Sequence, residues 1–129
     1  MKAKILLIED NEQNRYLATF LLEQNGFTVT HVFDGPAGII RAARERFDLI
    51  LLDIQLPGMD GYAVARALRA DPALATVPIV AVTSFAMLGD RDKALASGCN
   101  GHIEKPINPE TFVAEVSRHL QPTVGKDTS

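Results

Sequence analysis

Short apolar runs alternate along the chain with longer segments in which apolar residues recur every three or four positions. Short runs rich in Val, Ile and Leu are typical of β-strands, and longer periodic segments are typical of amphipathic helices. The run Leu49–Leu52 contains no polar residue, as expected for a strand buried on both faces of a parallel sheet. The expected strands are 4–8, 28–33, 49–52, 79–82 and 101–104, and the expected helices are 12–25, one that follows 34–36, 62–70, 90–97 and one that begins at 108 or 109.

Each predicted helix is expected to bury one apolar stripe against the sheet. Asn11 is placed to cap the first helix, and Gly26 and Gly98 are placed to end the first and the fourth. The stripes expected from the spacing are Leu17, Phe20, Leu21 and Leu22 in the first helix, Ile39, Ile40, Ala43 and Phe47 in the second, Val64, Ala65 and Leu68 in the third, and Phe112, Val113, Val116 and Leu120 in the last.

Strands that alternate with helices predict an α/β fold with a doubly wound parallel sheet. For five strands the common order is 2-1-3-4-5, which gives a flavodoxin-like three-layer sandwich with its switch point between strands one and three. We expect one domain over residues 1–121 and a polar C-terminal tail over 122–129, where no apolar pattern continues.

Composition narrows the class of protein. The 129 residues are 47% hydrophobic and 22% charged, which is typical of a soluble globular domain. No apolar run approaches the roughly 20 residues of a membrane span, and the start lacks the apolar core of a signal peptide, so we expect no membrane association and a cytoplasmic location. The net charge of −3 argues against direct DNA binding. The single cysteine, Cys99, is expected to be a small buried apolar residue.

Polar side chains follow four of the predicted strands. Glu9 and Asp10 follow the first strand, Asp53 the third, Thr83 the fourth and Lys105 the fifth. The carboxyl ends of parallel strands meet at one edge of the sheet, which is where open α/β sheets bind their ligands. We therefore expect these side chains to converge, with Asp53 at the centre.

The converging charges predict a metal ion. Two unit charges about 4 Å apart repel by about 4 kcal/mol at an effective dielectric constant near 20. Lys105 offsets one of the three negative charges, and the remaining charge of −2 matches a divalent cation. Oxygen ligands without His or Cys favour Mg²⁺ over Zn²⁺. A hydroxyl and a lysine beside such an ion suit phosphoryl oxygens, and one carboxylate is free to act as a nucleophile and form an aspartyl phosphate.

These residues, with Leu56–Gly61 after Asp53 and Pro106 after Lys105, resemble the receiver domain of two-component response regulators over nearly the whole chain. The resemblance implies a phosphoprotein of a phosphorelay in which Asp53 accepts a phosphoryl group from a phosphohistidine of a sensor histidine kinase or a histidine phosphotransfer protein. It implies a signalling protein that helps to catalyse its own phosphorylation and dephosphorylation, and not a conventional enzyme.

The resemblance also assigns the metal ligands and the output surface. Asp10 and Asp53 would ligate Mg²⁺ directly, Gln55 would give its backbone carbonyl, and Glu9 would act mainly through water. Because about nine residues follow the last predicted helix, we expect a single-domain regulator, similar to chemotaxis-type and cell-division-type regulators, with a leaning towards the latter. Its output would be a protein contact made by the face around the fourth helix, the fifth strand and the last helix.

Lys105 and Thr83 take the remaining roles that the resemblance implies. Lys105 would pair with the Asp53 carboxylate or its phosphate, and family members tend to hold the following bond to proline in cis. Thr83 would move to hydrogen-bond the phosphoryl group. Two positions depart from the family pattern: His102 stands where Tyr or Phe is common, which leaves open how Thr83 is coupled to a switch at that position, and Glu9 stands where Asp is frequent. Gln55 and Phe85 are implied to influence the phosphoryl lifetime.

Three other functions share part of the pattern. A haloacid dehalogenase-type phosphatase also uses an Asp after a parallel strand, but it needs a second Asp two residues on, where this chain has Gln55. A flavodoxin-like electron carrier needs a phosphate-binding loop after the first strand, where this chain has Glu9 and Asp10. The third is a receiver fold kept only as a docking module. The presence of Asp10, Asp53, Thr83 and Lys105 argues against it.

Overall fold

The computed structural model describes residues 3–84 and 88–120, which form a five-stranded, entirely parallel sheet. The strand order is β2-β1-β3-β4-β5, which confirms the predicted fold class and topology. The strands are β1 (Lys4–Ile8), β2 (Thr28–Val32), β3 (Leu49–Asp53), β4 (Ile79–Thr83) and β5 (Gly101–Glu104).

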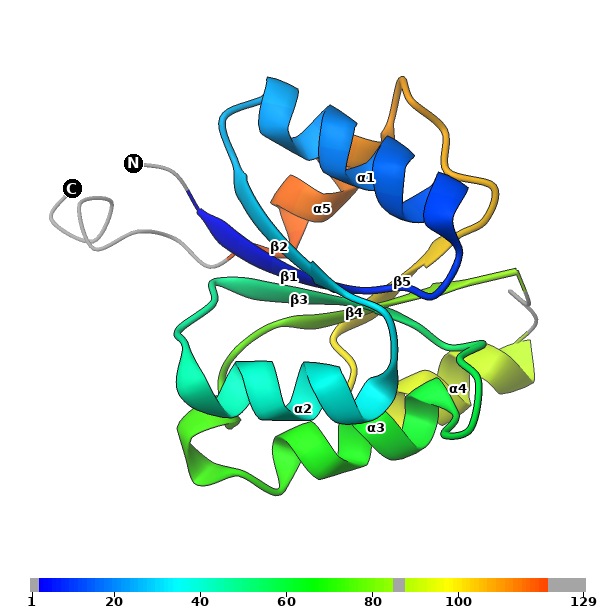
Figure 1. Ribbon diagram of the computed structural model, residues 1–129. Coiled ribbons are helices and arrows are strands. Elements are labelled where there is room, and N and C mark those ends of the chain that lie inside the picture. Colours follow the sequence, from blue (N-terminus) through cyan, green and yellow to red (C-terminus); the bar gives the residue numbers. More distant parts are fainter. Residues whose placement is uncertain (1–2, 85–87, 121–129) are drawn as a thin grey trace, which may run out of the picture.

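Helices cover both faces of this sheet and make three layers. Figure 1 shows α1 and α5 on one face and α2, α3 and α4 on the other. Among the helices of the described ranges, none has both the length and the apolar character that a membrane span requires. The helices are α1 (Glu12–Gln24), α2 (Gly35–Arg44), α3 (Gly61–Arg69), α4 (Leu88–Ala96) and α5 (Phe112–Arg118), with a short 3₁₀ turn at Pro72–Leu74.

Successive residues of the inner strands point to opposite faces and supply two separate cores. In β3, Leu49 and Leu51 pack under α1 and α5, whereas Ile50 and Leu52 pack under α2 and α3. All four are completely buried, and burying a side chain of this size contributes about 1.5–3 kcal/mol. The unbroken apolar run of the sequence is therefore explained by a strand that is covered on both sides.

The apolar stripe predicted for α2 is wrong for two of its four residues and confirmed for the other two, which pack in the core. Small residues, Gly38 and Ala42, face the sheet, whereas Ile40 and Ala43 are exposed. A Cβ atom on Gly38 would lie 2.4 Å from Cδ1 of Ile8, so the helix lies too close to β1 for large side chains. The distance between helix and sheet, which periodicity does not reveal, decides which face is buried.

Several predicted boundaries shift. The last helix begins at Phe112 and not at 108 or 109, because residues 108–111 form a turn whose Asn108 carbonyl accepts hydrogen bonds from the backbone of the residues that follow. Phe20, predicted to belong to the buried stripe of α1, is 46% exposed, and Phe47 is buried beyond the end of α2. The predicted boundary at residue 121 and the prediction for Phe85 lie outside the described residues.

Candidate functional site

The loop after β3 holds Asp53 at the carboxyl edge of the sheet. The Asp53 carboxylate accepts a hydrogen bond from the backbone N–H of Gln55 at 3.0 Å. A Cβ atom on Gly61 would lie 2.4 Å from the Cα of Ile54 and 2.7 Å from the Asp53 carbonyl oxygen. Glycine at position 61 therefore allows α3 to begin directly against the end of β3. Asp60 caps that helix with its side chain.

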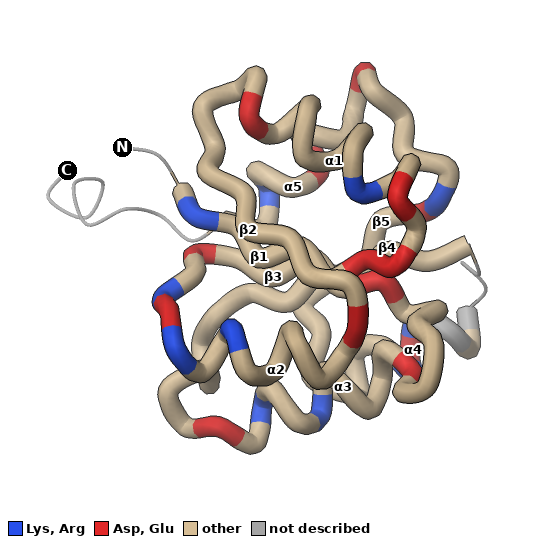
Figure 2. The backbone as a smooth tube through the Cα atoms, viewed as in Figure 1, with Lys and Arg blue, Asp and Glu red and all other residues tan. Residues whose placement is uncertain are grey.

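Three carboxylates meet at this edge. Oxygen atoms of Glu9, Asp10 and Asp53 all lie within 4.8 Å of one another. Glu9 and Asp53 are each only 2% exposed, whereas Asp10 is open to solvent. Figure 2 shows acidic positions gathered where β1 and β3 end. The structure thus brings together the three acids that the sequence predicted to converge.

Lys105 is the cation of this cluster. Its Nζ lies 3.1 Å from Oδ1 of Asp53 and 3.5 Å from Oε1 of Glu9, and its side chain is 13% exposed. The Lys105 backbone N–H donates to the Thr83 carbonyl at 2.9 Å, which fixes the chain after β5 beside β4. The peptide bond between Lys105 and Pro106 is cis, as the resemblance implied.

The carboxyl group of Glu9 loses its proton less readily than a free glutamate does. The pKa of Glu9 is raised from its usual value, first because the carboxyl group is buried and then because Asp53 lies beside it. Lys105 and the backbone N–H of Asn11, which donates to Oε2 of Glu9 at 3.1 Å, act in the opposite direction but do not cancel the rise. A second positive charge at this position would relieve the remaining repulsion.

The donor set fits a hard divalent cation. Each of the three acids offers one carboxylate oxygen within the 4.8 Å cluster, and oxygen donors are what Mg²⁺ and Ca²⁺ prefer. Lys105 lies against two of these carboxylates, those of Glu9 and Asp53, and its single positive charge offsets one of the three acids. The charge and the chemistry of the cluster therefore agree with the metal predicted from the sequence.

The other predicted site residues occupy two places. Thr83 is 4% exposed and ends β4 at the same edge as Asp53, which pairs in register with Val82. Gln55 is exposed, and its side-chain oxygen accepts a hydrogen bond from the Ser84 backbone at 3.4 Å. His102 lies apart from the acids. It pairs in register with a residue in the middle of β4 and, with α4, lines a cavity of about 210 Å³.

Sequence reasoning missed residues that shape the site from outside. Asp60 is the N-cap of α3, and its side chain accepts a hydrogen bond from the Ala63 backbone at 2.9 Å. Arg15 was given no role, yet its guanidinium donates to the Glu9 and Asp10 carbonyls. An aspartate three residues before a helical N–H was the available signal for the cap. The contact of Arg15 depends on the fold and had no such signal.

Comparisons with known proteins agree with this geometry. The chain matches the family model of the response regulator receiver domain over residues 5–117. It is 37% identical over 120 residues to the polar-differentiation response regulator DivK of Brucella anthropi, covering 93% of this chain and 98% of that protein.

Two solved structures show the same architecture. The chemotaxis response regulator CheY4 of Vibrio cholerae superposes with a TM-score of 0.90 at 29% identity, covering 93% of this chain and 100% of that one. The receiver domain of the sensor histidine kinase PA1611 of Pseudomonas aeruginosa, solved with a magnesium ion coordinated in its active-site cleft, superposes with a TM-score of 0.84 at 37% identity, covering 92% and 98%. The acidic cluster, the fold and these matches together show that the chain belongs to the response regulator receiver domain family of two-component systems.

Proposed function

We propose that this protein is a single-domain phosphoacceptor of a two-component phosphorelay, in which Asp53 takes a phosphoryl group from a phosphohistidine of a sensor histidine kinase or a histidine phosphotransfer protein. The observation that carries the proposal is the buried Asp53 carboxylate, 3.1 Å from the Lys105 ammonium and within 4.8 Å of two further acids. Membership of the receiver family supports the same reaction. The alignment with DivK of Brucella anthropi covers 98% of that protein, which supports a single-domain regulator.

Mg²⁺ is the proposed cofactor. Asp10 and Asp53 would hold it directly, with the backbone carbonyl of Gln55 and, through water, Glu9. The magnesium ion described for the PA1611 receiver domain supports this assignment, as does the cluster of oxygen donors. When bound, the ion supplies positive charge against the oxygens of the phosphoryl group.

The chain's own residues prepare Asp53 for the transfer. Oδ1 of Asp53 faces Lys105 Nζ and accepts from the Gln55 backbone, which fixes the plane of the carboxylate. A carboxylate oxygen of Asp53 forms the new bond to phosphorus while the phosphorus–nitrogen bond of the donor histidine breaks, and the leaving imidazole takes up a proton. Lys105 stays opposite the added negative charge, and the Thr83 hydroxyl donates a hydrogen bond to a phosphoryl oxygen.

The proposed output is a protein contact and not an enzymatic product. Phosphorylation would shift a two-state equilibrium on the face formed by α4, β5 and α5, with Thr83 and His102 as its switch residues. His102 lines the 210 Å³ cavity together with residues of α4, which supports its assignment to this face. We place the protein in the cytoplasm and propose no direct contact with DNA.

The test is phosphorylation by a small donor. The protein is incubated with Mg²⁺ and acetyl phosphate, and intact mass is measured. We expect one added phosphoryl group in wild type, none in Asp53→Asn and none when EDTA removes the metal. Asp60→Asn is the matched control, because it changes an acid of the same loop that serves as a helix cap.

Two results would contradict the proposal. An adduct that persists in Asp53→Asn would assign the acceptor to another residue, and no adduct in folded wild type would remove the phosphoacceptor function. Pull-downs with phosphorylated and unmodified protein then test the output, and equal capture of every partner by both forms would argue for a plain docking module. Rapid multiple turnover of the donor without an accumulated adduct would favour a phosphatase.

A further inference from the structure

Arg15 binds the loop that carries two of the three acids. Its Nη1 donates to the Glu9 carbonyl at 3.1 Å and to the Asp10 carbonyl at 3.0 Å. Arg15 lies in the first turn of α1, where its backbone N–H donates to the Asn11 carbonyl. One guanidinium therefore connects the start of α1 to the backbone of both acidic residues.

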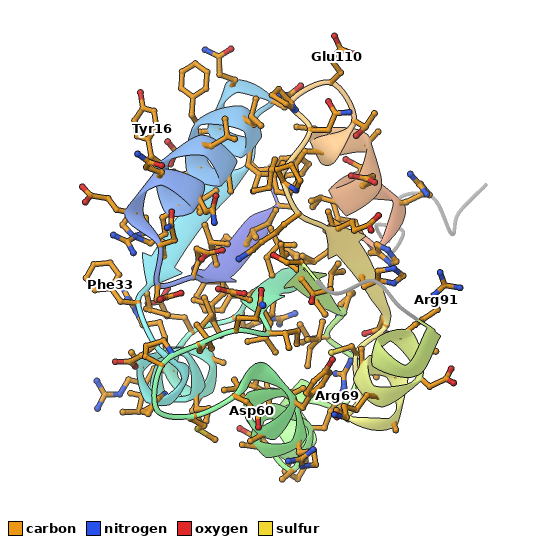
Figure 3. The ribbon with its side chains drawn as sticks, turned by 90° about the vertical axis from the view of Figure 1, so that its right-hand side faces the viewer. Tyr16, Phe33, Asp60, Arg69, Arg91 and Glu110 are labelled. Carbon is orange, nitrogen blue, oxygen red and sulfur yellow. The ribbon has the colours of Figure 1, made fainter. Side chains whose placement is uncertain are left out.

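The same guanidinium lies on an aromatic side chain at the end of β2. The Arg15 Cζ is 4.1 Å from the centroid of the Phe33 ring. Phe33 is 56% exposed, and Figure 3 shows it at the periphery of the molecule. Its preceding residue, Val32, accepts a hydrogen bond from the Glu9 backbone N–H at 3.2 Å. The Phe33 ring and the Glu9–Asp10 loop are thus both connected to the end of β2.

We propose that Arg15 is a positioning residue that holds the Glu9–Asp10 backbone in place for the divalent cation, with Phe33 as the platform that orients its guanidinium. This inference rests on the proposed metal site. Three carboxylates within 4.8 Å repel one another, and the Asp10 side chain is open to solvent, so its position depends on the backbone that carries it. Arg15 fixes that backbone without contributing a ligand.

Because Arg15 is positively charged, an electrostatic role and a positioning role predict opposite changes in Mg²⁺ affinity when it is removed. A positive charge near a cation site repels Mg²⁺, so removal of Arg15 by electrostatics alone would tighten Mg²⁺ binding. Loss of a positioning contact predicts the opposite, because outer contacts that orient metal ligands typically affect metal affinity about 10- to 100-fold. The direction of the change separates the two roles.

The experiment measures the Mg²⁺ dissociation constant by NMR titration of the full chain. We expect Arg15→Gln to weaken binding about tenfold, at the lower end of the range for such contacts. Phe33→Leu should weaken it about threefold, as expected for loss of an exposed cation–π contact. Because Phe33 acts through Arg15, the double variant should match Arg15→Gln. Arg15→Lys, which keeps the charge but not the planar fork, should lie between Arg15→Gln and wild type.

Arg44→Gln is the control for net charge, because it removes a positive charge from an exposed position at the end of α2. Tighter or unchanged binding in Arg15→Gln, or additive effects in the double variant, would overturn the proposal. If Arg15→Gln does not fold, an unchanged affinity in Phe33→Leu overturns it instead. No Mg²⁺ binding by wild type would remove the proposed metal site and this inference together, whereas wild-type binding with an unaffected Arg15→Gln removes the inference alone.

Discussion

Glu9 should destabilise the metal-free protein at neutral pH, and Glu9→Gln should remove this effect. Burial and the neighbouring Asp53 raise the pKa of Glu9 from 4.5 to about 7. Between these two values the folded state binds more protons than the unfolded state, so stability falls as pH rises through the window and is constant above it. At about 1.4 kcal/mol per pKa unit, the ionised carboxylate costs the folded state up to about 3 kcal/mol above pH 7.

The assay is urea unfolding followed by far-UV circular dichroism, since the chain has no tryptophan. In EDTA, Glu9→Gln should be as stable as wild type near pH 4.5 and more stable by about 1–3 kcal/mol at pH 8, within the limit set by the pKa change. With Mg²⁺ at pH 8 the difference should shrink or reverse, because the cation stabilises the ionised cluster.

Glu12→Gln is the control, because it neutralises an exposed acid three residues away, in the first turn of α1. It should change stability by less than about 0.5 kcal/mol at either pH, as is usual for surface substitutions. A Glu9→Gln protein that is no more stable than wild type at pH 8 in EDTA would contradict the proposed cost of the ionised carboxylate. So would a stability difference between them that does not depend on pH.

Three further predictions concern the scaffold. Gly61→Ala should destabilise the protein by about 1–3 kcal/mol in urea unfolding, because the added methyl group meets backbone atoms of Ile54 and Asp53. Gly89→Ala is the control and should not destabilise it, because the space around Gly89 is open. Equal effects of the two substitutions would contradict this prediction. Arg69→Gln should lower the free energy of unfolding by about 2–3 kcal/mol, because Arg69 donates to the Gly98, Leu74 and Val77 carbonyls at 2.6–2.8 Å near α4 (Figure 3). The same change should leave Mg²⁺ affinity unchanged. A loss of affinity would show that the Arg69 contacts influence the metal site. Burial raises the pKa of the Cys99 thiol to about 11. Iodoacetamide at pH 8 should therefore modify Cys99 slowly in the native protein and rapidly in urea, as measured by intact mass. Equal rates in the two conditions would show that the thiol is accessible in the native protein.

The fold class and the position of the acids could be predicted because both follow from local pattern and topology. A strand covered by helices on both faces is apolar throughout, so the run Leu49–Leu52 can be recognised in the sequence as such a strand. Parallel strands all end at one edge, so acids that follow β1 and β3 meet there when these two strands are neighbours, as they are in the predicted order. Neither conclusion requires a measured distance.

The stripe of α2, the start of α5 and the Arg15 contact could not be predicted in the same way. Gly38 faces β1 because that helix packs closely on Ile8, and the closeness of packing is a property of the assembled layers. Arg15, which follows β1, reaches the ring of Phe33, which follows β2, because β1 and β2 lie side by side. These contacts join segments whose separation the sequence does not contain.

The order of strands and helices, and the residue types that stand at the carboxyl edge, can be predicted from the chain alone, because hydrophobic periodicity and chain direction act locally. The distance from Lys105 Nζ to Asp53, the burial of Glu9 and the rise of its pKa are set by the packed fold. Electrostatic energies depend on the distance between charges and on the water around them, and both are fixed only when distant segments pack together.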